Sequence, residues 1–117
     1  VANYTYDALN RLKTISYPAA STENMTFIYD ASSSANSGIG RLTRINKSGA
    51  NLAFYYDHAG NLKQTDTTIN NVGKTITYTY DKVGNITRIS YPSNRFVYYT
   101  YNNLGQLGTI TTKIVSS

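Results

Sequence analysis

One stretch of the sequence decides the fold, Phe54-Tyr55-Tyr56-Asp57-His58-Ala59-Gly60-Asn61-Leu62, because its pattern occurs five times in the chain. Each copy has an aromatic residue, a variable residue, Tyr-Asp or Tyr-Asn, a turn ending in Gly or Asn, and an aliphatic residue. The candidate structural residues of the five copies are Tyr6, Asp7, Asn10 and Leu12; Tyr29, Asp30, Gly40 and Leu42; Tyr56, Asp57, Gly60 and Leu62; Tyr80, Asp81, Gly84 and Ile86; and Tyr101, Asn102, Gly105 and Leu107. Self-similarity with a period of roughly twenty residues is typical of a repeat architecture.

The third copy predicts a β-hairpin. Phe54 and Tyr56 have the same parity, so both side chains face one side of a strand. Asp57 stands where a type I turn favours a short side-chain acceptor, and Gly60 takes the left-handed position that follows. This turn sets Tyr56 opposite Leu62 as a cross-strand pair.

The substitutions within the pattern favour the same geometry. The first copy replaces Gly with Asn10, and Asn is a non-glycine residue that tolerates the left-handed region. The fifth copy replaces Asp with Asn102, which can cap the turn in the same way. The pattern therefore varies only between residues that can take the same backbone conformation or cap the turn in the same way. This indicates that the backbone geometry of the turn constrains the pattern.

The position before each turn Gly or Asn is apolar, although a turn exposed to solvent is usually polar. These residues are Leu9, Ile39, Ala59, Val83 and Leu104. We expect each tip to rest on the next repeat, because a lone hairpin is marginally stable in water. The prediction is an all-β chain of side-by-side antiparallel hairpins in one curved or spiralling sheet, a β-solenoid or shell segment. The hairpins are expected at about 4–24, 27–50, 54–74, 78–95 and 98–114.

The outgoing strands carry a second apolar residue three positions after the first. The pairs are Leu12 with Ile15, Leu42 with Ile45, Ile86 with Ile89, and Leu107 with Ile110. In a regular strand this odd spacing would turn the two side chains to opposite faces. Either a bulge intervenes or both faces of the sheet are partly covered.

The second copy contains an insertion. Asp30 and Gly40 are ten positions apart, whereas Asp57 and Gly60 are three apart. The inserted residues 31–38 are rich in Ser, Ala and Gly, which predicts a flexible surface loop and the first site of limited proteolysis.

The composition limits the function classes. The chain has no Cys, so a disulfide framework and a thiol catalyst are excluded. It begins at Val1 and ends at Ser117 without a signal peptide or an apolar run long enough to span a membrane. We therefore interpret residues 1–117 as one segment of a longer protein. The net charge of +5 comes from scattered Lys and Arg, which are typical of solvated strand faces.

With these five motifs laid out, the chain resembles the YD-repeat or Rhs-repeat (rearrangement hotspot) family from about Tyr4 to about Ile110. The resemblance implies a hollow β-shell that, in bacterial toxin complexes and polymorphic toxins, encloses the C-terminal toxic segment of the same polypeptide. Related shells occur in teneurin adhesion receptors. The resemblance implies a secreted or cell-surface bacterial protein that is not an enzyme in this segment. The family's autoproteolytic core region and any toxin domain have no counterpart here.

No catalytic, cofactor-binding or metal-binding residue is predicted. His58 is the single histidine and has no Cys, Glu or second His near it in the sequence. The repeated acids precede turns singly, without the spacing of a calcium repeat. We expect turn capping rather than ligand binding from them.

Twelve Tyr residues leave a second hypothesis, a carbohydrate-binding or adhesion module. In Tyr55-Tyr56 and Tyr98-Tyr99, neighbouring rings must point to opposite faces of the sheet, so stripes of Tyr and Lys/Arg could hold an acidic glycan. Nucleic-acid binding is a third hypothesis. The expected partners are neighbouring repeats of the parent chain, an enclosed cargo, a glycan, and further copies that associate through open strand edges.

Overall fold

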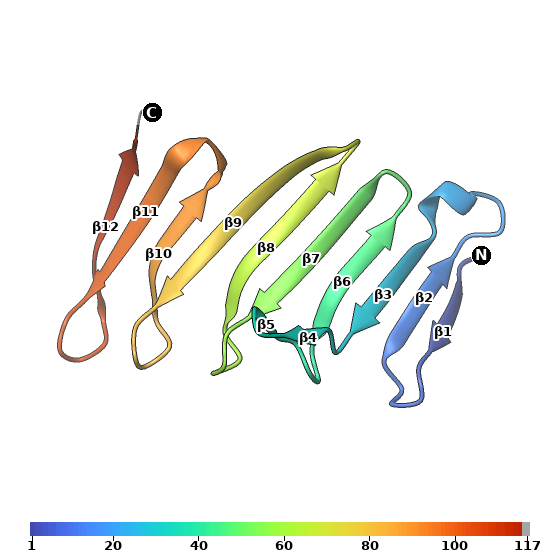
Figure 1. Cartoon of the computed structure of the whole chain (residues 1–117), viewed down its shortest axis with the longest axis horizontal. Helices are drawn as coiled ribbons and strands as arrows, with labels where there is room; N and C mark the ends of the chain where they lie inside the picture. Colours follow the sequence, from blue (N-terminus) through green and yellow to red (C-terminus); the bar gives the residue numbers. More distant parts are fainter. Residues whose placement is uncertain (116–117) are drawn as a thin grey trace.

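The computed structural model describes residues 1–115, in which ten strands form one open antiparallel sheet (Figure 1). The strands lie in the order β1-β2-β3-β6-β7-β8-β9-β10-β11-β12, which is the order of the chain with β4 and β5 left out. Their bounds are β1 Asn3–Tyr6, β2 Leu12–Ser16, β3 Met25–Tyr29, β4 Ser32–Ser33, β5 Asn36–Ser37, β6 Leu42–Lys47, β7 Ala50–Tyr56, β8 Leu62–Ile69, β9 Val72–Tyr80, β10 Ile86–Tyr91, β11 Arg95–Tyr101 and β12 Leu107–Ile114. The 3₁₀ turns η1 (Ser21–Glu23) and η2 (Pro92–Asn94) connect strands. The prediction of an all-β sheet of side-by-side hairpins is confirmed.

The sheet is far from flat. Its Cα atoms extend over 52 × 34 × 29 Å, and a flat single layer would be far thinner than 29 Å. No helix within residues 1–115 has the length and hydropathy that crossing a membrane requires.

The turns have the geometry that the motif predicts. In the third hairpin the Gly60 amide donates to the Asp57 carbonyl at 3.0 Å, and Gly60 has a φ of +88°. Asn10 takes the same left-handed conformation with a φ of 65°. In every hairpin the Tyr of the motif lies opposite its aliphatic partner: Tyr6 and Leu12, Tyr29 and Leu42, Tyr56 and Leu62, Tyr80 and Ile86, Tyr101 and Leu107.

A β-bulge explains the odd spacing of the apolar pairs. In the second hairpin Leu42 lies opposite Tyr29 and Ile45 lies opposite Phe27, so Thr43 is the additional residue. The bulge therefore returns Ile45 to the same face as Leu42. Equivalent register shifts occur in the other four hairpins.

The two faces of the sheet differ in chemistry. One face carries the motif Tyr residues and the aliphatic residues opposite them, and we call it the Tyr–Leu face. The other carries mainly Thr, Asn, Gln and Ser, and we call it the polar face; one row across it consists of Ile28, Arg44, Ala53, Asp66 and Thr75. No hydrophobic residue within 1–115 is fully buried, because one sheet covers neither of its own faces.

The turn tips do not pack as predicted. Leu9, Ile39, Val83 and Leu104 are 71%, 64%, 80% and 82% exposed, and Ala59 is exposed too. The expectation that each tip rests on the next repeat is wrong. The turns project beyond the edge of the sheet (Figure 1), so neighbouring hairpins meet along their strands instead.

The insertion 31–38 is not the flexible loop that its composition predicts. Its residues form a small hairpin, β4–β5, and Asn36 is only 7% exposed. The Asn36 side chain donates to the Phe54 carbonyl at 3.1 Å and accepts from the Tyr56 amide at 2.9 Å. The ladder between β6 and β7 ends at Ala53, so Asn36 takes the place of a strand for the end of β7.

Candidate functional site: the seams between hairpins

A seam is the boundary between the outgoing strand of one hairpin and the incoming strand of the next. The four seams are β2/β3, β6/β7, β8/β9 and β10/β11. At each seam the backbone ladder stops before the turn end of the strands. For example, the β8/β9 ladder ends at Gln64 opposite Thr77, three residues before Tyr80. The turn end of every seam therefore needs another connection.

The Tyr of the motif provides that connection. Its hydroxyl crosses the seam and donates to the backbone carbonyl of the aliphatic motif residue in the preceding hairpin. The four bonds are Tyr29 to Leu12 at 2.8 Å, Tyr56 to Leu42 at 2.7 Å, Tyr80 to Leu62 at 2.5 Å and Tyr101 to Ile86 at 2.6 Å. One side chain thus pairs with its own hairpin through its ring and with the previous hairpin through its hydroxyl.

Two of these hydroxyls have perturbed acidity. Partial burial raises the pKa of Tyr56 and of Tyr80 above the ordinary value of 10.0. Both hydroxyls therefore keep their proton, and remain donors, over the whole physiological range of pH.

The Asp of the motif organises the turn. Asp81 Oδ1 accepts from the Val83 amide at 3.0 Å and from the Asn85 amide at 2.9 Å. Hydrogen bonding from the Asn85 amide lowers the pKa of Asp81, because the bond favours the ionised carboxylate. Asn102 makes the equivalent bonds to Leu104 at 2.9 Å and Gln106 at 3.0 Å without a charge.

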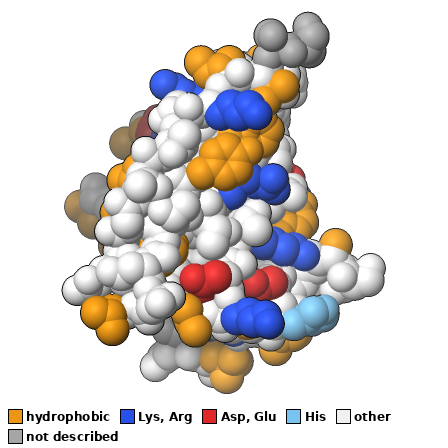
Figure 2. All heavy atoms as spheres, turned by 90° about the vertical axis from the view of Figure 1, so that its left-hand side faces the viewer, with side chains coloured by type: hydrophobic (Ala, Val, Ile, Leu, Met, Phe, Trp, Pro, Cys, Tyr) orange, Lys and Arg blue, Asp and Glu red, His pale blue; other side chains and the backbone are white. Residues whose placement is uncertain are grey.

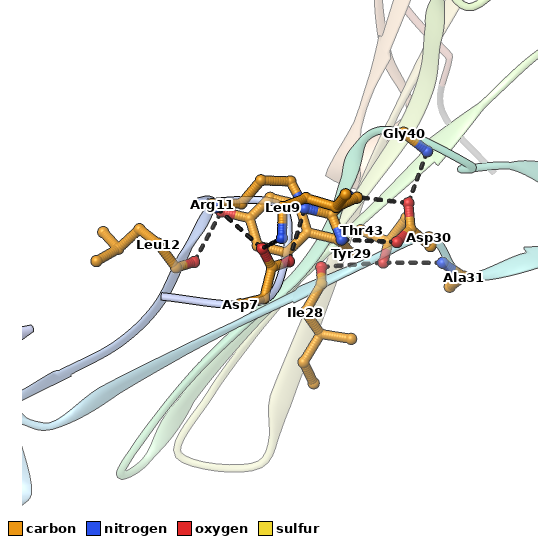
Figure 3. Close-up of polar contacts among 10 residues, drawn as sticks. All are labelled: Asp7, Leu9, Arg11, Leu12, Ile28, Tyr29, Asp30, Ala31, Gly40 and Thr43. Carbon is orange, nitrogen blue, oxygen red and sulfur yellow. Dashed lines mark hydrogen bonds and ion pairs between the residues drawn. The ribbon is translucent and has the colours of Figure 1, made fainter. Parts of the chain in front are cut away.

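Arg11 links the first two hairpins (Figure 3). Its Nε donates to Asp7 in its own turn at 2.7 Å, while Nη1 and Nη2 donate to both carboxylate oxygens of Asp30 at 3.1 and 2.8 Å. The guanidinium also lies 4.3 Å from the ring centroid of Tyr29. The hydrogen bond from Arg11 lowers the pKa of Asp30, and bidentate pairing of this kind is the strong form of an ion pair.

Arg41 links the second and third hairpins in a different way. Its Nη1 donates to the carbonyls of Ser37 and Ile39 at 3.1 and 3.2 Å, and its guanidinium lies 5.6 Å from the Tyr56 ring centroid. The same guanidinium packs against Gly60, and it would have to shift if Gly60 were replaced by a residue with a side chain.

The later hairpins carry an amide at the position of Arg11 and Arg41. Asn61 and Asn85 each donate to the Asp of their own turn at 3.3 Å. The sequence reasoning placed both arginines among scattered surface charges and missed their role. Their recurrence immediately after the left-handed turn residue was the signal that could have found it.

The single histidine lies outside the seams. His58 is exposed at its turn, with Nδ1 3.2 Å from Ser37 Oγ. Within residues 1–115 no group of three or more His, Asp or Glu side chains has the arrangement of a metal site.

The structure places the motif residues together at the turn end of the sheet. The Tyr residues tie the seams, the aliphatic residues lie opposite them and supply the accepting carbonyls, and the Asp or Asn residues hold the turns. The site is thus a repeated structural joint.

Comparison with known proteins agrees with the motif. No curated protein sequence matches the chain. A family model described as Teneurin YD-shell matches residues 32–113, which is more than half of the chain. The chain therefore belongs to the YD-shell family, and it is a structural segment of a YD-repeat shell.

Proposed function

We propose that the wall formed by this chain encloses and shields a C-terminal toxin or other cargo segment of its own parent polypeptide. The parent is a secreted or cell-surface bacterial protein, and this segment forms part of the shell wall and catalyses no reaction. Family membership supports the structural role. The cargo and the bacterial source belong to the proposal.

The observation that carries the proposal is the tie at every seam. A wall that retains a cargo must not open between its repeats, and strand ladders alone leave the turn end of each seam unpaired. The four Tyr hydroxyls close these ends. The repeated polar side chains are also engaged in turns and seams, which favours a non-enzymatic role.

The partners follow from the topology. Within residues 1–115, strands β1 and β12 each have one unpaired edge. We propose that neighbouring repeats of the parent chain pair with these edges, and that the isolated segment self-associates through them.

Protease protection of the cargo in the full parent protein tests the proposal. A variant with Tyr29, Tyr56, Tyr80 and Tyr101 changed to Phe is expected to expose the cargo to protease sooner than the wild type. A matched variant with Tyr55, Tyr78, Tyr98 and Tyr99 changed to Phe keeps every seam bond and is expected to protect. If the cargo is digested equally fast with and without the shell, enclosure is wrong.

A second candidate function is carbohydrate binding or adhesion. On the polar face Arg88 lies 5.9 Å from the Phe96 ring centroid, and Phe96 stacks on Tyr98 at 6.3 Å. Figure 2, which views the sheet from the side of β12, shows basic side chains interleaved with hydrophobic ones. Phe96 and Tyr98 are half-buried and Arg88 is exposed, and accessible rings beside a cation suit sugars, which bind by stacking and hydrogen bonding.

A further inference from the structure

The polar face is hollowed where the insertion hairpin lies against it. One cavity of about 350 Å³ is lined by residues that include Ile28, Ser33, Asn36, Arg44, Ala53 and Tyr55. A second cavity of about 200 Å³ is lined by Arg44, Asn51, Ala53, Tyr55, Asp66 and Thr68. Arg44, Ala53 and Tyr55 line both, so the two cavities form one groove across β6, β7 and β8. We call it the insertion groove.

The insertion makes this region a groove instead of an open sheet face. Asn36 bonds to the backbone of Phe54 and of Tyr56, the two neighbours of Tyr55. This fixes the backbone on both sides of Tyr55, whose ring lies on the polar face. The groove thus has a wall and an aromatic surface held by the same side chain.

The floor of the groove has a defined charge pattern. Arg44 lies opposite Ala53 across one ladder, and Asp66 lies opposite Ala53 across the next. The Cα atoms of Arg44 and Asp66 are therefore separated by two strand spacings, about 10 Å. The small side chain of Ala53 leaves the space between the cation and the carboxylate open.

Both charged groups are available to a ligand. Asp66 Oδ1 accepts from Gln64 Nε2 at 2.9 Å and from Thr75 Oγ1 at 2.8 Å, which orients the carboxylate. Its Oδ2 accepts no hydrogen bond from residues 1–115. Arg44 is exposed and forms no ion pair within the described part of the chain.

The chemistry of the groove discriminates between ligand classes. Asp66 would repel a nucleic acid, which carries a phosphate at every nucleotide, more than a sugar chain in which acidic units alternate with neutral ones. A peptide added as a strand needs a free sheet edge, and β6, β7 and β8 are all interior strands. Hydroxyl donors suit Asp66, a carboxylate suits the fork of Arg44, and an apolar sugar face suits the ring of Tyr55.

We infer that the insertion groove binds a short acidic oligosaccharide, with a sugar carboxylate on Arg44, sugar hydroxyls on Asp66 and a ring stacked on Tyr55. This inference rests on the second candidate function and locates its site. It is independent of whether the wall encloses a cargo.

Calorimetric titration of the 117-residue chain with two probes tests the inference. One probe is a tetrasaccharide that alternates glucuronic acid and N-acetylglucosamine, and the other is the neutral chitotetraose. Arg44→Gln is expected to lower the affinity for the acidic probe by roughly tenfold or more, because it removes one charged hydrogen-bond partner. The affinity for the neutral probe is expected to stay unchanged. Asp66→Asn is expected to lower the affinity for both probes.

The control is Lys74→Gln, which removes an exposed cation from the opposite, Tyr–Leu face and is expected to bind as the wild type does. Thermal melts of all variants verify folding; Arg44 is exposed at the surface, so its replacement leaves the sheet intact. If Arg88→Gln, beside Phe96, loses binding and Arg44→Gln does not, the chain binds carbohydrate on the polar face but not in the insertion groove. If neither probe binds the wild type, or if Arg44→Gln binds the acidic probe normally, this inference is overturned.

Discussion

At the scale of single residues, the Tyr hydroxyls have a separable effect on stability. Tyr80→Phe removes only the bond to the Leu62 carbonyl at 2.5 Å and keeps the ring opposite Ile86. We expect a loss of about 0.5–1.5 kcal/mol in the free energy of unfolding. Tyr78→Phe is the control, because the Tyr78 hydroxyl makes no hydrogen bond within residues 1–115 and lies on the same strand and face. Urea unfolding measures both, and equal losses would contradict the seam tie.

The turn carboxylates predict loss of stability in acid. The pKa values of Asp7, Asp30, Asp57 and Asp81 are lowered below 3.8 in the folded chain by hydrogen bonds to the ionised form. A lowered pKa means that the stabilisation is complete above the unfolded value and disappears as the pH falls through the folded value. The urea midpoint is therefore expected to fall as the pH is lowered below about 4 and through the lowered pKa values of these carboxyl groups.

Asn102 shows which variant isolates this effect, because it holds the fifth turn without a titratable group. Changing all four aspartates to Asn should flatten the dependence of the urea midpoint on pH in that range. An unchanged dependence would mean that other groups cause the acid sensitivity.

The local geometry of each hairpin was predictable from residues, since Tyr56, Asp57, Gly60 and Leu62 lie within one short turn. The acceptor of each Tyr hydroxyl was not, because Leu42 precedes Tyr56 in a different hairpin. The same is true of Arg11, whose main partner Asp30 lies across a seam. Recurrence at one position of the motif can mark such a side chain, but it does not identify the partner in the neighbouring repeat.

At the scale of secondary-structure elements, the left-handed turn residue sets the hairpin. Gly84 has a φ of +91°, and a Cβ there would meet no atom within 4 Å. Gly84→Ala is therefore expected to cost about 1–2 kcal/mol from backbone conformation alone. Gly84→Asn should cost less, as Asn10 adopts this conformation in the first hairpin. Gly73→Ala, in strand β9 with extended backbone, is the control, and thermal unfolding of the three variants gives the order.

The insertion hairpin depends on one buried amide. Asn36→Ala removes two hydrogen bonds and leaves a carbonyl and an amide of β7 without partners, at an expected cost of about 1–3 kcal/mol. We expect protease cleavage within 31–38 to be slow in the wild type and fast in Asn36→Ala. Exposed Ser34→Ala is the control, and rapid cleavage of the wild type would show that the hairpin is not docked.

The docked state of the insertion could not be read from its composition. Ser, Ala and Gly in residues 31–38 are typical of a flexible loop, and they are also small enough to pack closely on a strand. What decides between these outcomes is the short ladder of β6 with β7, which leaves the end of β7 open to Asn36. The unpaired end of β7 results from how β6 and β7 pair, and it cannot be read from the residues of the insertion.

At the scale of the whole molecule, the absence of a buried core within residues 1–115 predicts graded stability. Each hairpin contacts only its neighbours, so opening should start at the ends of the sheet and move inward. Amide hydrogen exchange is expected to be fastest in β1 and β12 and slowest in β7 and β8. Uniform protection across the ten strands would contradict this and indicate one cooperative unit.

The continuous sheet was predicted for a reason that proved wrong. The exposed tips Leu9, Val83 and Leu104 hold nothing together, and strand pairing with the Tyr ties does so. The five copies of the motif indicate that the hairpins have equivalent geometry, and hairpins of equivalent geometry are expected to align side by side in one sheet.

The bulges have a geometric consequence for a shell built from many such repeats. Each hairpin has its additional residue at the same level of the outgoing strand, and a bulge bends the strand that contains it. Every hairpin therefore contributes a similar increment of curvature in the same direction. Adding whole repeats to such a shell extends its arc while the radius stays nearly constant, so each repeat sets the curvature of the shell and the number of repeats sets its extent.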